Sequence, residues 1–378
     1  MFFILNIAVV VGILLYQLSK EDFVPITGLR LNLVALVIII ALFVGQLLCD
    51  CSSVSYLLKV STGKWRFATA YKVTEIGRYY DSVTPMATGG QAFQVTYLKN
   101  HGVPLHNSLS IPLAKYVFGQ IAWVVISFIS LIISFTDKSY GTFVSVMSII
   151  GFVLSFFVLA VTLFLCVCKT VGKKLVVKVL KLLHKMKIVK DYDKQYEKIT
   201  KYISDFQDVM KQYAKSPKDF LILTFLNLAK VFLNYSIPFF VVSLFVPGLE
   251  GELFLRLMVM SVLVDLSSSF FPMPGGTGLN EISFTAAFGS VVGQQSILVW
   301  VLLLWRFCSY YFYLLQGVCI LSYDVALGNK KYKWQVRKEN LAEESAAFKQ
   351  AQIDKFRRDR LKRRKNTQKS NKDIKEFL

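Results

Sequence analysis

Ionisable and polar side chains gather around two glycine- and proline-containing breaks in an otherwise apolar sequence. The breaks are Thr84-Pro-Met-Ala-Thr-Gly-Gly90 and Pro272-Met-Pro-Gly-Gly-Thr-Gly278. The ionisable or amide side chains beside them, or in the apolar run that follows, are Glu75, Arg78, Asp81, Gln91, Asp265, Glu281 and Arg306. Guanidinium groups suit phosphate, and carboxylates can hold an amine or pair with the arginines. The set predicts a binding site for a polar, phosphate-bearing group.

Catalytic and metal-binding chemistry is not expected from this sequence. The hydroxyls of Ser267–Ser269 and the thiol of Cys308 have no histidine near them in sequence. Six cysteines and three histidines are scattered, and the two Cys-x-Cys pairs lack the further ligands that a zinc site needs. We therefore expect no catalytic residue, no metal and no cofactor.

The elements that must position these residues are membrane-spanning helices. Of the 378 residues, 54% are hydrophobic and only 18% are charged, against about 25% charged in typical soluble domains. The apolar excess falls in runs that approach the length needed to cross a hydrocarbon core of ~30 Å; they are Leu33–Leu48, Val117–Phe135, Phe143–Val167, Leu221–Val246 and Ser296–Tyr323. The run Phe2–Leu18 has no preceding Lys or Arg and no clear cleavage site, so it is interpreted as a first span.

The net charge of +20 is localised and predicts the topology. Residues 169–190 hold eight Lys and no acidic residue, and residues 330–378 hold seventeen Lys and Arg against seven Asp and Glu. Basic loops stay in the cytoplasm, so a multi-pass protein of the cell membrane with both termini cytoplasmic is expected. Both segments should contact anionic lipid of the inner leaflet and not nucleic acid. Lys173–Val189 has the pattern of an amphipathic surface helix, followed by a polar helical connection.

This topology makes the two broken segments face opposite ways. Residues 65–102 must begin and end inside, and residues 253–294 must begin and end outside. Breaks at corresponding places in two halves are typical of re-entrant helical hairpins in an inverted repeat; ordinary loops between two short spans are the alternative. The fold class predicted is an all-α polytopic membrane protein, divided into a first half 1–168 with hairpin 66–104, a connection 169–217, a second half 218–325 with hairpin 253–294, and a tail 326–378.

Three motifs in order resemble one known family. They are YYDSVTPMATGGQAFQVTYLKNHGVP, DLSSSFFPMPGGTGLNEISF and WRFCSYYFYLLQG. They look like the signature regions of the lysylphosphatidylglycerol synthase transmembrane, or flippase-like, family, which includes the membrane half of the multiple peptide resistance factor. The resemblance covers most of residues 1–325. It implies a lipid-handling core in which the hairpins form a cavity for phospholipid headgroups.

The residues carried over as headgroup-binding candidates combine the ionisable set with the motif positions. They are Glu75, Arg78, Asp81, Thr84, Gly89, Gly90, Gln91, Asp265, Gly275, Gly276, Gly278, Glu281, Arg306 and Tyr310. The glycines are expected to let backbone amides approach the phosphate. A homo-oligomer is compatible with this arrangement.

The function predicted is binding of a phospholipid and its translocation between leaflets. In the full-length resistance factor a cytoplasmic domain moves lysine from lysyl-tRNA to phosphatidylglycerol. The roughly 50 residues after the last apolar run are fewer than the ~100 of a typical domain, so that transfer is not expected of this sequence. A lipid-modifying transferase and a scaffold that acts through the basic tail are the alternatives.

Overall fold

The structure is a computed structural model, and it describes residues 31–84, 87, 89–136, 142–167, 215–269, 271 and 273–326, with seven single positions between 196 and 213. The expected first span, both basic segments and most of the connection between the halves lie outside the described residues. Of the described part, the residues up to Tyr323, apart from Asn100–Gly102, belong to one compact unit.

Five described helices are long and apolar enough to cross a membrane. They are α2 (Leu33–Thr62), α5 (Leu105–Thr136), α6 (Thr142–Val167), α9 (Pro217–Phe245), and a last helix made of α12 (Gln295–Arg306), the π-helical η5 (Phe307–Tyr311) and α13 (Phe312–Ala326). The chain is an all-α membrane protein with several spans. Each of the five predicted runs lies in one of these helices, except that Val246 is the cap residue after α9.

Helix α2 continues well past the predicted end at Leu48. Its second half buries the polar side chains of Gln46, Asp50, Ser53 and Ser55 against the rest of the protein. Asn32 caps its first turn, and Gly63 ends it in a left-handed conformation with φ of 73°. The prediction stopped too early because polar residues that face protein interrupt the hydropathy signal without interrupting the helix.

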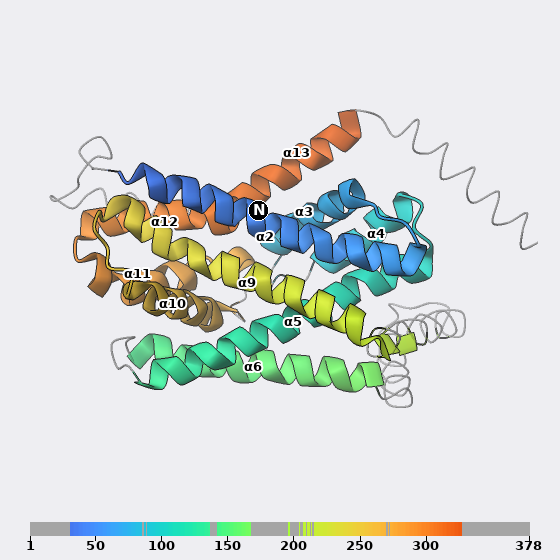
Figure 1. The fold of residues 1–378 in the computed structure, drawn as a ribbon, viewed down its shortest axis with the longest axis horizontal. Coiled ribbons are helices and arrows are strands. Elements are labelled where there is room, and N and C mark those ends of the chain that lie inside the picture. The colour runs from blue at the N-terminus through green and yellow to red at the C-terminus, as the bar shows by residue number, and fades with distance from the viewer. Residues whose placement is uncertain are drawn as a thin grey trace, which may run out of the picture. The chain divides into compact units, whose positions relative to one another are not determined.

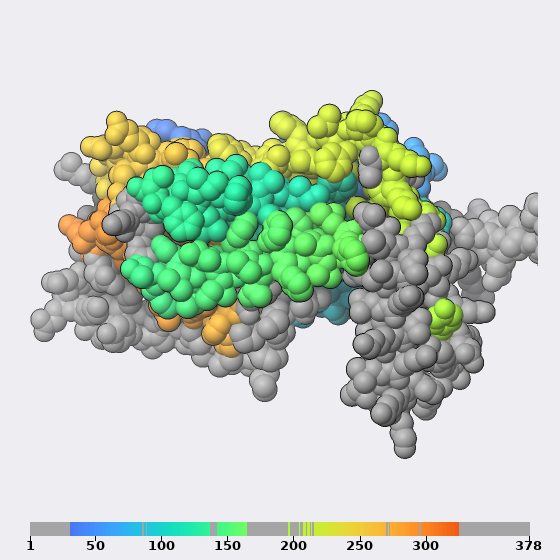
Figure 2. All heavy atoms as spheres, turned by 90° about the horizontal axis from the view of Figure 1, so that it is seen from below, coloured from blue at the N-terminus to red at the C-terminus, as the bar shows by residue number. Residues whose placement is uncertain are grey.

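The long helices pack lengthwise. Helices α2 and α9 lie side by side, and α5 packs between α9 and α6 (Figure 1). Helices α5 and α6 cover one face together (Figure 2). Helix α6 exposes large apolar side chains such as Val153, Phe156 and Phe157, as expected of a helix that faces lipid.

Each of the two broken segments forms a pair of short helices. The first is α3 (Phe67–Val83) with α4 (Gly90–Asn100); the second is α10 (Leu253–Ser268) and α11 (Leu279–Val292), with a short turn of helix, η4 (Pro274–Gly276), at the break. They enter the bundle from opposite ends (Figure 1), and α3 contacts η4. The two breaks therefore meet inside the unit. Re-entry into a membrane and an inverted repeat remain predictions.

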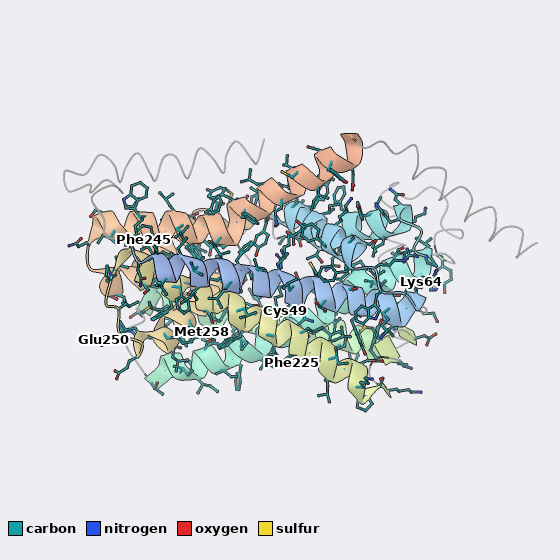
Figure 3. All side chains as sticks on the ribbon, turned by 45° about the horizontal axis from the view of Figure 1, so that its top comes forward. Cys49, Lys64, Phe225, Phe245, Glu250 and Met258 are labelled. Atoms are coloured by element: carbon teal, nitrogen blue, oxygen red, sulfur yellow. The ribbon has the colours of Figure 1, made fainter. Side chains whose placement is uncertain are left out.

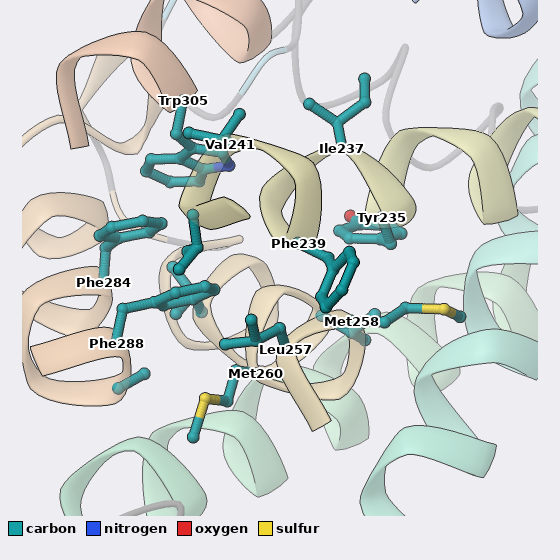
Figure 4. Close-up of a cluster of buried hydrophobic side chains, with 14 of the residues drawn as sticks. Tyr235, Ile237, Phe239, Val241, Leu257, Met258, Met260, Phe284, Phe288 and Trp305 are labelled. Carbon is teal, nitrogen blue, oxygen red and sulfur yellow. The ribbon is translucent and has the colours of Figure 1, made fainter. Parts of the chain in front are cut away.

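The apolar core lies mainly around the second hairpin. The ring of Phe284 stacks on Phe288 at 4.1 Å and on Trp305 at 4.5 Å between ring centroids (Figure 4). Helix α10 is buried along most of its length. Ser148 of α6 donates a hydrogen bond to the Leu263 carbonyl at 2.8 Å. This packing holds the second hairpin firmly against α6, α9 and α12.

Candidate functional site

A cavity of about 430 Å³ lies between α2, α3, α5, α9 and the π-helical turn. Most of its lining side chains are polar; they include Gln46, Asp50, Arg78, Asp81, Gln91, Gln94, Lys115, Tyr116, Gln120, Asn227, Lys230, Asn234, Tyr235 and Tyr313. Cys49, which precedes Asp50, lies midway along the bundle between Lys64 at one end and Phe245 at the other (Figure 3). The cavity is therefore far from both ends of the long helices.

Three cations from three different helices surround the carboxylate of Asp50. The guanidinium of Arg78 lies 2.6 Å from Asp50 Oδ2, the Lys115 ammonium 3.3 Å from Oδ1, and the Lys230 ammonium 3.4 Å from Oδ2. The Asp50 side chain is fully buried. Arg78 also lies 3.4 Å from Glu75 and over the ring of Tyr313, 4.4 Å from its centroid. We call Asp50, Arg78, Lys115 and Lys230 the charge cluster.

Burying the charge cluster inside a membrane protein costs free energy, so its presence points to a function. Ionisable groups within membrane segments are rare and usually mark a functional path or site. Three cations share one carboxylate, while Asp81 at the cavity wall accepts a hydrogen bond from the Gly90 amide at 2.8 Å. An anion that enters the cavity would find cationic donors converging on one point.

The first break is held together by its own side chains. The hydroxyl of Thr84 accepts a hydrogen bond from the Gly89 amide at 2.9 Å, as Asp81 does from Gly90. A β-carbon on Gly90 would lie 2.4 Å from the Gly77 carbonyl, so glycine is what lets α3 and α4 approach. The sequence led us to expect that these amides donate to a phosphate. In this structure both N–H groups already donate to side chains of the protein.

The second break is held by an ion pair. Arg306 donates from Nε to Glu281 Oε1 at 2.6 Å and from its terminal nitrogen to the Gly275 carbonyl at 3.2 Å. The other Glu281 oxygen accepts from the Gly278 amide at 2.6 Å. Gly275, Gly276 and Gly278 all have positive φ, at 63°, 62° and 94°. Arg306 and Glu281 thus stabilise the break, and neither lines the larger cavity.

A second cavity of about 230 Å³ lies between the two breaks. Ala87 of the first break and Gly275 and Gly276 of the second line it, together with Asp265, Ser268, Ser269 and Asn280. Asp265 accepts a hydrogen bond from the Tyr235 hydroxyl at 2.6 Å. Trp123 and Tyr235, stacked at 5.5 Å, line both cavities. The stacked pair is therefore a wall common to the two.

The structure divides the predicted site residues among these places. Arg78, Asp81 and Gln91 line the larger cavity, with Glu75 buried beside Arg78. Thr84, Gly89 and Gly90 form the first break, and Gly278, Glu281 and Arg306 hold the second. Asp265, Gly275 and Gly276 line the smaller cavity. Tyr310 lies between the breaks.

Sequence reasoning missed most of the charge cluster. Asp50, Lys115 and Lys230 lie on long helices rather than beside a break. Lys230 carried a usable signal, since it stands in the middle of the apolar run Leu221–Val246. Asp50 and Lys115 lie just outside the predicted runs and were therefore overlooked.

The fold and the charge cluster define a class: a polytopic helical membrane protein with a charged cavity inside its bundle. The chain belongs to the family described as the lysylphosphatidylglycerol synthase TM region, which matches residues 3–317. It is also similar to a UPF0104 membrane protein of Archaeoglobus fulgidus, with 22% identity over 270 residues that cover 68% of this chain and 77% of the relative. No solved structure matches the chain.

Proposed function

We propose that the protein binds the phosphate-bearing headgroup of a phospholipid in the larger cavity and moves that lipid between the leaflets of the cell membrane. The observation that carries the proposal is the charge cluster, in which three cations converge on Asp50 inside a membrane-spanning bundle. Membership of the family supports a lipid substrate. A headgroup that crosses hydrocarbon unaided loses its water partners at high cost, and a polar cavity replaces them.

Asp50 acts in this proposal as an internal counter-ion. In the empty cavity its carboxylate neutralises Arg78, Lys115 and Lys230 in part. A lipid phosphate would share the same cations and take over part of that role. Because the protein keeps the cations paired both before and after the lipid binds, neither state leaves buried charge without a partner.

The side chains around the cluster suit the remainder of a headgroup. Gln46, Gln91 and Asn234 line the same cavity. Their amides can donate to ester oxygens, and they can both donate to and accept from hydroxyl groups. Arg78 is held on two sides, by Asp50 and by the Tyr313 ring. It is therefore positioned before the lipid arrives, which lowers the entropic cost of binding.

The test is lipid movement in vesicles that contain the purified full chain. Vesicles of phosphatidylcholine carry a trace of phosphatidylglycerol with a fluorescent acyl chain, and a membrane-impermeant reductant reports how much label has reached the outer leaflet. The wild type should speed the exchange over protein-free vesicles. Lys230→Gln should slow it by about 10- to 150-fold, because a charge-assisted contact contributes roughly 1.5–3 kcal/mol.

The matched control is Lys99→Gln, which removes the same charge from an exposed position on α4. It should move lipid at the wild-type rate. Equal rates for Lys230→Gln and Lys99→Gln would refute the role of the charge cluster. An aminoacylated lipid that appears in cell extracts only with the wild type would favour the transferase alternative instead.

A further inference from the structure

We infer that Asp265, in the smaller cavity, is a proton-binding site that takes up a proton when an anionic headgroup enters the larger cavity. The link to the headgroup rests on the proposed function; the proton site itself rests on the surroundings of Asp265. Two observations carry the inference. The Asp265 carboxylate lies in a polar cavity and accepts a hydrogen bond from the Tyr235 hydroxyl, and this cavity shares a wall with the larger cavity that holds the charge cluster.

Three helices near α10, namely α9, α11 and α12, carry ionisable side chains. Helix α9 supplies Tyr235, which donates to Asp265 Oδ2, and, at the larger cavity, Lys230. Helix α11 supplies Glu281, and α12 supplies Arg306. Arg306 is already bound to Glu281 through Nε at 2.6 Å.

The two remaining neighbours of α10 add little charge near Asp265. Helix α5 contributes Lys115 and Tyr116, both at the larger cavity, and residues 142–164 of α6 contain no ionisable residue. Among the described residues, no ion pair to Asp265 is formed. A carboxylate at membrane depth that has a hydroxyl but no cation as partner is readily neutralised by a proton.

Binding at the two cavities must then be linked. A phosphate in the larger cavity adds negative charge on the other side of Trp123 and Tyr235, and this charge favours the protonated form of Asp265. By reciprocity, a proton on Asp265 favours the bound anion. The proton comes from water and adds to the carboxylate, so its charge offsets one negative charge of the lipid.

Tyr235 is the side chain that protonation of Asp265 would affect directly. Its hydroxyl donates to the charged carboxylate, and protonation replaces that strong acceptor by a weaker one. The ring of Tyr235, stacked on Trp123, is then less firmly held. The wall between the cavities would loosen in the state in which both the lipid and the proton are bound.

The experiment measures proton uptake directly. The full chain in weakly buffered detergent at pH 7 is mixed with phosphatidylglycerol, and an indicator dye reports the protons taken up for each lipid bound. The wild type should take up a measurable fraction of a proton, at most about one for each lipid. Asp265→Asn should bind the lipid without uptake. Asp219→Asn should behave as the wild type. It removes a carboxylate that accepts a hydrogen bond from Tyr56 and lies outside both cavities.

Unchanged proton uptake in Asp265→Asn would overturn the inference. So would a wild type that takes up no proton and binds the lipid only in sodium salt, not in choline salt. Infrared spectra of the lipid-free chain separate the two proposals. A protonated-carboxyl band that titrates in the wild type and is lost in Asp265→Asn supports the proton site even if no lipid binds. Should Asp265→Asn not fold, Tyr235→Phe serves instead, because loss of the donor should move that band's titration to higher pH; a titration that does not move refutes the inference.

Discussion

The hydroxyl of Tyr310 donates a hydrogen bond to the main-chain carbonyl of Ser82 at 3.0 Å, across 228 positions in the sequence. Tyr310 lies in the π-helical turn Phe307–Tyr311 of the last span, and Ser82 lies at the end of α3 beside the first break. The ring of Tyr310 also packs on Gly275 of the second break. One side chain thus joins both hairpins, and the extra residue of a π-helical turn is a common feature of functional sites.

Removal of that hydroxyl should loosen the two hairpins without unfolding the chain. For Tyr310→Phe we expect a loss of about 1 kcal/mol in the free energy of unfolding, the usual worth of a hydrogen bond, and a changed rate of lipid exchange. Thermal unfolding and the vesicle assay measure the two effects. Tyr311→Phe removes the same group from the next position and is the control. Identical exchange rates for the two variants would contradict a role for the Tyr310 bond.

The Arg306–Glu281 pair should prove structural. Glu281→Gln leaves a buried guanidinium without its counter-ion and should cost roughly 3–5 kcal/mol, seen as a lower melting temperature. Arg306→Gln should cost a similar amount. In the double variant neither charge remains, so its cost should be clearly smaller than the sum of the two single costs. Additive losses would show that the two side chains do not act as a pair.

Gly275 should tolerate alanine much less well than Gly248. Both have positive φ, at 63° and 80°. A β-carbon on Gly275 would lie 2.2 Å from the Tyr310 ring, whereas one on Gly248 would have nothing within 4 Å. Gly248→Ala therefore shows the cost of backbone strain alone, about 1–2 kcal/mol. Gly275→Ala should cost this plus about 1–3 kcal/mol for overpacking; equal melting temperatures would refute the close packing.

Loss of the counter-ion in the charge cluster should make stability depend on anionic lipid. Asp50→Asn leaves three cations without the carboxylate they share. Its melting temperature in neutral detergent should fall below that of the wild type. Added phosphatidylglycerol should raise it by more than it raises the wild type, because a ligand that binds the folded state more tightly stabilises that state more. Equal shifts in the two proteins would contradict the exchange of Asp50 for a phosphate.

Much of the fold could be predicted from the amino-acid sequence, because the features that specify these helices are local. Each of the five apolar runs among the described residues matches a long helix, and each glycine- and proline-containing break separates two short helices, since hydropathy and backbone preference act over a few residues. Arg78, Asp81 and Gln91, which were singled out beside the first break, line the larger cavity; their binding of a headgroup stays a prediction. Glu281 and Arg306 were singled out by the same reasoning, but their partners could not be foreseen.

The place where charge converges depends on how the helices pack. Asp50, Arg78, Lys115 and Lys230 come from four helices and meet through packing between segments far apart in sequence, which no local pattern records. The same holds for the Tyr310–Ser82 bond and for the wall of Trp123 and Tyr235. From the amino-acid sequence alone we can predict a membrane protein of long apolar helices, with two broken segments and ionisable residues beside the breaks. The packing of the helices makes one candidate residue, Arg78, part of a cationic cavity, and another, Arg306 of the last span, a structural partner of Glu281.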